Sequence, residues 1–232
     1  RAGHGALDPL YKSEFKGNAE IKRRELKNGK DCIIFGCLGR EAKINSDEYA
    51  EAVAQILTQV PNSIYIWTGR INHPEISSRF RELGILDRCR FIGWVNTALY
   101  AQVLDVFLDS FPFASGHTAF ESMAAGCPVI VRITPESLES SSLTHILPAF
   151  RSSQVPKNIQ EDIRHTWLDE YGNMLLPIVE DFDSYVNTAV QLAVDRDFRH
   201  RIGELSRMFV NRFMMDTKLM AETHTNHILD II

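Results

Sequence analysis

The sequence predicts an α/β protein built on a doubly wound, Rossmann-like parallel sheet with a helical C-terminal tail. From Asp31 onward, short apolar runs alternate with segments whose apolar residues recur at helical spacing. The runs are continuously apolar, which is typical of strands that are covered on both faces. With 44% hydrophobic and 24% charged residues among 232, the composition is that of a globular protein with a full core, and it argues against a disordered chain or a coiled coil.

Turn-forming residues mark where several elements are expected to begin or end. The first helical pattern stops before Pro61, the second runs from Pro74 to Gly84, and the fourth ends at Gly126. Helices are therefore expected over 47–59, 74–83, 97–104 and 118–125. Strands are expected over 32–36, 63–67, 89–92, 106–109, 128–133 and 175–179.

Three regions follow from these patterns. Residues 1–30 are expected to form a linker or a peripheral helix, 31–183 the Rossmann-like domain, and 184–232 C-terminal helices that pack on it. Within the domain, 136–172 shows no clear period and is expected to hold short helices and loops. The chain begins with Arg1 and its first methionine is Met123, so we expect it to be a piece of a longer protein.

Charge and composition also limit the partners and the compartment. The chain has 25 Lys and Arg against 30 Asp and Glu, a net charge of -5, so no broad basic surface for nucleic acid or an anionic membrane is expected. No apolar run approaches the roughly 20 residues of a membrane span, and the N-terminus does not read as a secretory signal. We expect a cytoplasmic protein whose cysteines are reduced core thiols, namely Cys32, Cys37, Cys89 and Cys127.

The ends of the predicted strands carry the candidate binding residues. In an open parallel sheet, ligands bind beyond the carboxyl ends of the strands, where helix N-termini also point. Each exit contains glycine, and together they supply a cluster of hydrogen-bond donors in an acidic protein, which favours a polyanion. These donors are Arg40, Lys43, Arg70, His117 and Thr118.

The most informative stretch is residues 111–130. Gly116 allows close approach of the backbone to an anion, and Thr118 lies where the next helix is expected to begin, so the amides there can bind phosphate. Glu121, one turn further, could accept hydrogen bonds from the two hydroxyls of a ribose. The alternative is structural, since Thr118 and Glu121 have the spacing of a capping box.

This stretch reads G-x-T-x-x-E-x-M-A-x-G-x-P-V-I from Gly116 to Ile130 and resembles the nucleotide-sugar signature of the C-terminal donor domain of GT-B glycosyltransferases. The resemblance implies that His117 and Thr118 contact a diphosphate and that Glu121 binds ribose. The Gly-His-Thr sequence is loosely similar to O-GlcNAc transferases and HMW1C-like protein glycosyltransferases, although the spacing to Glu121 is one residue shorter than in O-GlcNAc transferase.

Two further segments are similar to motifs of the same family. The loop from Phe35 to Lys43 is similar to the one whose basic residues meet the donor phosphates, and Phe91–Val95 has the F-x-G-x-V form of the segment whose backbone recognises the base. The implied donor-binding residues are Gly39, Arg70, Gly93, Trp94, Val95, Gly116, His117, Thr118, Ala119 and Glu121. As plain alternatives, Arg40 and Lys43 could be solvated surface charges, and the packing or surface roles of Trp94 and Arg70 are the more common ones.

No metal site is predicted. The acidic pairs 181–183 and 195–197 imitate the D-x-D metal motif of another glycosyltransferase fold, but the first flanks a helix start and the second lies in a helical tail. Arg40, Lys43 and His117 are the candidates for stabilising the leaving diphosphate in place of a metal.

The resemblance implies the donor-binding half of a glycosyltransferase that uses a nucleotide sugar, with UDP-sugars favoured. The acceptor domain is expected in a missing N-terminal half, so the isolated chain should bind nucleotide and transfer little or no sugar. The sugar, the acceptor and the retaining or inverting outcome stay open. Two alternatives also stay open: a UDP-sugar epimerase of the same fold, and a non-enzymatic α/β interaction module.

Overall fold

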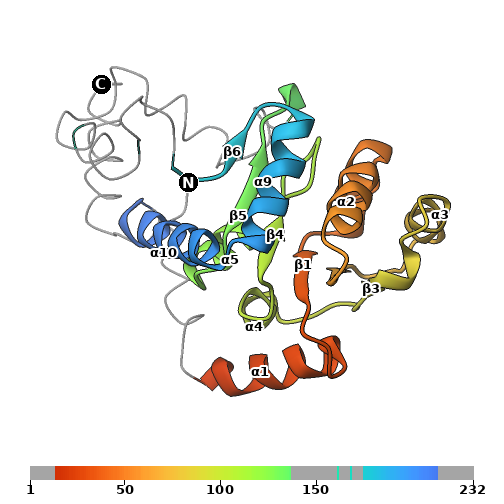
Figure 1. The fold of residues 1–232 in the computed structure, drawn as a ribbon, viewed down its shortest axis with the longest axis horizontal. Helices are drawn as coiled ribbons and strands as arrows, with labels where there is room; N and C mark the ends of the chain where they lie inside the picture. The colour runs from red at the N-terminus through yellow and green to blue at the C-terminus, as the bar shows by residue number, and fades with distance from the viewer. Residues whose placement is uncertain (1–13, 137–160, 162–167, 169–174, 214–232) are drawn as a thin grey trace, which may run out of the picture.

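The fold is organised around a six-stranded sheet in which every pair of neighbouring strands is parallel (Figure 1). The computed structural model describes residues 14–136, 161, 168 and 175–213. The strand order is β3-β2-β1-β4-β5-β6, so the chain reverses its winding direction between β3 and β4. The strands are β1 (Ile33–Cys37), β2 (Ser63–Trp67), β3 (Cys89–Phe91), β4 (Val106–Leu108), β5 (Val129–Arg132) and β6 (Ile178–Val179).

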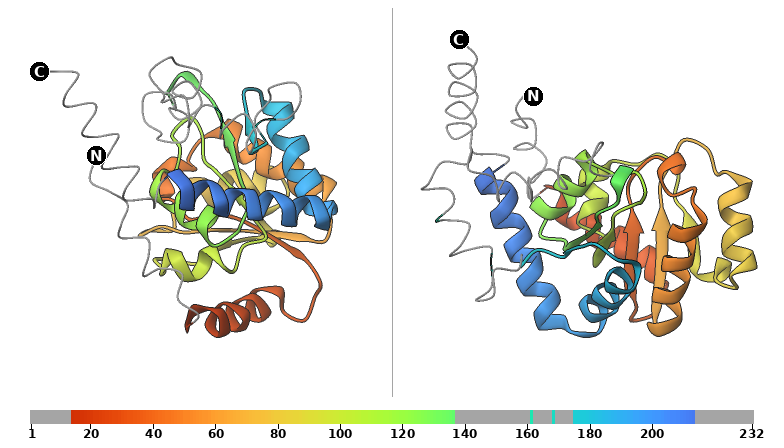
Figure 2. Two further views of the ribbon diagram at one scale, coloured as in Figure 1. Left: turned by 90° about the vertical axis from the view of Figure 1, so that its left-hand side faces the viewer. Right: turned by 90° about the horizontal axis from the view of Figure 1, so that it is seen from above.

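Helices form a layer on each face of this sheet, which confirms the doubly wound prediction (Figure 2). In one layer α2 contacts α3 and α9, and in the other α5 contacts α4 and α10, with α1 beside α4. None of the helices in the described residues is long and apolar enough to cross a bilayer. The helices are α1 (Glu14–Lys27), α2 (Asp47–Gln59), α3 (Pro74–Glu82), α4 (Thr97–Ala101), α5 (His117–Ala124), α9 (Phe182–Val194) and α10 (Arg196–Phe213), with short 3-10 turns η2 (Glu41–Lys43) and η3 (Leu86–Arg88).

The core lies between the sheet and its two helical layers. Every residue of β2 and β4 is buried, as expected for strands covered on both sides. Aromatic rings fill the space under the carboxyl half of the sheet: Tyr49 meets Phe111 at 5.3 Å between centroids, and Phe111 meets Tyr185 at 5.1 Å. Each edge-to-face pair of this kind contributes about 0.5–1.5 kcal/mol beyond the area it buries.

The four cysteines belong to this core. All are free and buried. Burial raises the pKa of each thiol above its ordinary value, so the thiols are protonated at neutral pH and unreactive.

The predicted helices and strands are found in order, with shifts at their ends. The helix expected over 97–104 stops at Ala101, because the following residues turn so that Asp105 accepts a hydrogen bond from Ile34 N at 2.9 Å at the start of β1. Residues 14–27 form the helix α1, and residues 184–213 lie in α9 and α10. Almost all of the segment expected to hold short helices and loops, and the end of the chain from residue 214, lie outside the described residues.

Candidate functional site

A cavity of about 280 Å³ opens at the carboxyl edge of the sheet, where the order of winding reverses. The residues that follow β1 and β4 line it on one side, and those that follow β2 and β3 line it on the other. This is the position at which open parallel sheets bind ligands. The lining residues are Leu38, Gly39, Arg40, Lys43, Thr68, Trp94, Val95, Thr97, Ser115 and Thr118.

The loop after β1 brings two cations to this cavity. Thr68 donates a hydrogen bond to Gly39 O at 2.8 Å, which ties the loop to the end of β2. Lys43 Nζ donates to Ala114 O, so one of its three protons is already used. Arg40 is exposed, and its side chain makes no hydrogen bond or ion pair with another described residue, so its guanidinium donors face solvent or a ligand.

The first turn of α5 borders the cavity on the side of β4. Gly116 is the N-cap, with φ 70° and ψ -110°, a conformation that residues with a side chain rarely adopt. The capping-box alternative is therefore wrong, and the helix starts one residue earlier than expected: because Gly116 is the N-cap, the helix begins at His117 and Thr118 is its second residue. The Thr118 hydroxyl oxygen is buried and has no hydrogen-bond partner among the described residues.

His117 and Glu121 lie beside each other behind this turn. His117 is half exposed, whereas Glu121 is only 5% exposed, and its Oε1 lies 3.5 Å from His117 Nε2. Neither residue lines the cavity. A carboxylate in this place can orient the imidazole.

The exits of β2 and β3 supply Arg70 and Trp94. Trp94 is 68% exposed and borders the cavity, so it is not the packing residue of the alternative interpretation. The Arg70 guanidinium lies 5.3 Å from the centroid of the indole, a cation–π contact, while its backbone N–H donates to Glu41 Oε2 at 3.0 Å. Arg70 thus lies at the surface and contacts the cavity only through Trp94.

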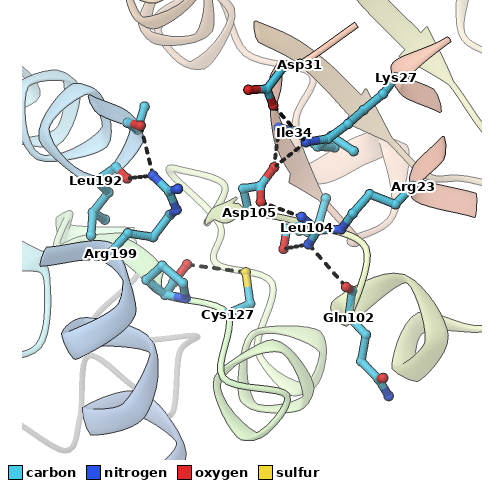
Figure 3. Close-up of polar contacts among 12 residues, drawn as sticks. Arg23, Lys27, Asp31, Ile34, Gln102, Leu104, Asp105, Cys127, Leu192 and Arg199 are labelled. Carbon is cyan, nitrogen blue, oxygen red and sulfur yellow. Dashed lines mark hydrogen bonds and ion pairs between the residues drawn. The ribbon is translucent and has the colours of Figure 1, made fainter. Parts of the chain in front are cut away.

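A larger cavity, about 600 Å³, lies at the opposite, amino edge of the sheet. Three of the arginines that line it, Arg23, Arg199 and Arg207, donate to groups of the protein itself, and Figure 3 shows these contacts for Arg23 and Arg199. Arg23 donates to Asp105 at 2.6 Å, and Arg199 donates to Leu192 O at 2.7 Å and Ala193 O at 2.8 Å at the end of α9. Cations at these positions satisfy the last carbonyls of helices, so the smaller cavity is the better ligand site despite its size.

The two acidic pairs act as helix caps. Asp181 accepts a hydrogen bond from Ser184 N at 2.7 Å at the start of α9, and Asp195 accepts one from Phe198 N at 2.8 Å at the start of α10. Carboxylates are favoured at these positions because they satisfy free amides and oppose the helix dipole.

Several solved structures have an architecture similar to that of this chain. No protein-family model and no curated protein matches the sequence. An O-GlcNAc transferase from Thermobaculum terrenum is 19% identical with a TM-score of 0.60, over 85% of this chain and 35% of that chain. TarM from S. aureus is 12% identical with a TM-score of 0.58, over 85% of this chain and 36% of that chain. The C-terminal domain of LpcC, a group 1 family glycosyl transferase from Francisella tularensis, is 17% identical with a TM-score of 0.55. The match covers 82% of this chain and 92% of that chain.

The chain has the fold of a GT-B glycosyltransferase C-terminal domain. It spans about a third of the length of the first two proteins and most of the LpcC domain. The similarity therefore covers one half of a GT-B enzyme.

Within this GT-B half, the predicted residues fall into two groups. The residues that the structure brings together on the cavity are Gly39, Arg40, Lys43, Trp94, Val95 and Thr118. Those that lie next to it without lining it are Arg70, Gly93, Gly116, His117, Ala119 and Glu121. Four further lining residues, Leu38, Thr68, Thr97 and Ser115, were not predicted as site residues, although each lies within seven residues after a strand.

Proposed function

We propose that this chain is the donor-binding half of a glycosyltransferase, which binds a UDP-sugar in the cavity at the carboxyl edge and transfers the sugar to an acceptor. The observation that carries the proposal is the combination, at the point where the sheet reverses its winding, of Arg40 and Lys43 with the first turn of α5. Cations and helix-terminal amides together are the usual protein ligands of phosphate.

The diphosphate is proposed to lie between Arg40 and the start of α5. When the glycosidic bond breaks, the nucleoside diphosphate leaves with additional negative charge, and donors fixed in advance lower the barrier to that step. Arg40, Lys43 and the amide of Thr118 can supply this stabilisation without a metal ion. His117, one residue before Thr118, adds a further donor from the helix start, and Glu121 holds its imidazole.

The nucleoside is proposed to lie towards β3. Trp94 and Val95 border the cavity there, and an exposed indole offers a surface on which a base can stack. UDP is favoured because the TarM structure with the same fold was determined in complex with UDP. The contact of Glu121 with ribose stays a prediction, since its carboxylate is buried and now faces His117.

The acceptor and the catalytic base are proposed to lie in another part of the enzyme. The chain corresponds to about a third of two full-length proteins of this fold, and the sugar end of a nucleotide in this cavity would project beyond the strand ends, away from the sheet. The isolated chain should therefore bind nucleotide but transfer little sugar.

Isothermal titration with UDP, UDP-GlcNAc and GDP tests this proposal. We expect UDP and UDP-GlcNAc to bind the wild type. Arg40→Ala should weaken UDP binding about tenfold, the value of a charge-assisted contact to phosphate. Arg81→Ala on α3 is the matched control, because Arg81 is an exposed arginine that does not line the cavity.

Two results would contradict the assignment. If no nucleotide releases or absorbs heat at millimolar concentration, the chain is an interaction module and the cavity is not a donor site. If UDP binds with equal affinity to wild type, Arg40→Ala and Glu121→Gln, those two residues do not have the proposed roles.

A further inference from the structure

Asp109 is a buried carboxylate beneath the loop that joins β4 to α5. It follows β4 directly and is 1% exposed. Its Oδ1 accepts two backbone hydrogen bonds, from Ser110 N at 3.0 Å and from Ser115 N at 2.7 Å. One oxygen thus connects the two ends of the loop, while Oδ2 has no hydrogen-bond partner among the described residues.

The carbonyls of this loop are held by side chains from other parts of the molecule. Ser46, the N-cap of α2, donates to Phe111 O at 3.0 Å. Thr134, after β5, donates to Pro112 O at 3.2 Å, and Lys43 donates to Ala114 O. The backbone of the loop therefore has a defined conformation. Asp109 accepts hydrogen bonds from two of its amides, and side chains from other elements donate to its carbonyls.

The loop leads directly into the candidate donor site. Ser115 lines the cavity, and the next residues are Gly116, His117 and Thr118 at the start of α5. A shift of the Ser115 backbone would move the amides that are proposed to receive the diphosphate. Ångström-scale displacement of such donors is enough to weaken binding and catalysis.

The charge of Asp109 is costly at this place, because the carboxylate is buried. Burial raises the pKa of Asp109 to about 6, against the hydrogen bonds of Ser115 and Ser110 and the charge of Lys43. Tyr185, which donates to Asp109 O at 2.8 Å, and Cys37 face the same space. A buried carboxylate also lies close to where an anionic ligand would bind, which Coulomb repulsion disfavours.

We propose that Asp109 is a positioning residue of the donor site, whose carboxylate holds Ser115 and, through it, the first turn of α5 in the geometry that binds the diphosphate. This inference depends on the proposed function for its ligand. It assigns to Asp109 no contact with the nucleotide.

The test compares Asp109→Ala and Asp109→Asn. Asparagine keeps an oxygen that can accept from Ser110 N and Ser115 N, whereas alanine removes the acceptor. We expect UDP to bind Asp109→Ala about tenfold or more weakly, as for the loss of two charge-assisted hydrogen bonds, and Asp109→Asn to bind it within about threefold of the wild type. Asp105→Asn at the other end of β4, which also removes a buried carboxylate bound to a backbone amide, should leave UDP affinity unchanged.

Hydrogen exchange of the amides over residues 110–118 supplies a readout that needs no ligand. We expect faster exchange in Asp109→Ala and wild-type exchange in Asp109→Asn. Unchanged exchange in Asp109→Ala, or wild-type UDP affinity of that variant, would overturn the inference. If alanine prevents folding, Asp109→Asn decides, because a tenfold loss of affinity there contradicts positioning through hydrogen bonds. A wild type that binds no nucleotide refutes the proposed function alone, and the exchange comparison then decides the role of Asp109.

Discussion

The two edges of the sheet use the same kinds of residue for different purposes. At the amino edge, helices end, and Arg23 and Arg199 donate to the carbonyls and carboxylate that lie there. At the carboxyl edge, α5 begins, and the side chain of Arg40 has no hydrogen bond or ion pair with another described residue. The larger cavity is at the amino edge, so volume alone would select the other cavity as the ligand site. Cations bound within the protein contribute to stability, whereas cations without an internal partner are available to a ligand.

Arg23→Ala should have the largest effect and should act on stability only. Arg23 donates to Asp105 at 2.6 Å and to Leu104 O at 3.1 Å, and the Asp105 side chain is only 11% exposed. Removing the arginine leaves this carboxylate with Lys27 at 4.0 Å as its remaining cation. We expect a loss of about 3 kcal/mol in the free energy of unfolding, measured in urea, with unchanged UDP affinity.

Arg24→Ala is the control for this change. Arg24 lies on the same helix, its side chain is 80% exposed, and its Nε is 3.8 Å from Glu20, so its loss should cost at most about 0.5 kcal/mol. Equal losses in the two variants would show that the contacts of Arg23 with Asp105 and Leu104 do not stabilise the amino edge.

Asp109, which follows β4 at the carboxyl edge, sharpens the comparison through the pH dependence of stability. The pKa of Asp109 is about 6 in the folded protein and has the ordinary value of 3.8 when unfolded. Between these values the folded protein holds a proton that the unfolded chain has released, so the contribution of Asp109 to wild-type stability falls as pH rises from about 4 to about 7. Asp109→Asn lacks this proton. Its free energy of unfolding relative to wild type should therefore rise by about 2 kcal/mol over that range.

Urea unfolding at several pH values measures this difference, in which the other titrating groups cancel because both proteins contain them. A flat difference for Asp109→Asn would mean that the Asp109 carboxyl group titrates alike in the folded and unfolded states.

Much of the fold could be predicted from the sequence because local patterns specify it. Continuous apolar runs identified the strands, and Pro74, Gly84 and Gly126 marked helix ends close to where the structure has them. The end of α4 was placed too late, since the turn after Ala101 is set by Arg23 and Asp105, which are 82 residues apart in the chain. Contacts of that kind leave no local pattern.

The candidate site was predicted less completely. The rule that ligands bind beyond strand ends brought Arg40, Lys43 and Thr118 to one cavity. It gave no role to Asp109, because an aspartate at the end of a strand looks like any turn residue until its bonds to Ser110 and Ser115 are seen. The capping-box interpretation of Thr118 failed for a related reason, since spacing alone cannot show that Gly116 turns the chain first.

Arg207→Ala should have the smallest effect and gives the most direct test of the comparison between the two cavities. Arg207 lines the larger cavity and is exposed, and it donates to Ala125 O at 3.3 Å at the end of α5. A weak, exposed contact with a helix C-terminus is worth about 0.5 kcal/mol, so the loss of stability should be of that size. UDP affinity should not change, because α5 presents its other end to the donor cavity. If Arg207→Ala instead weakened UDP binding as much as Arg40→Ala, the nucleotide would bind at the amino edge. The assignment of stability to the amino edge and of ligand binding to the carboxyl edge would then be wrong.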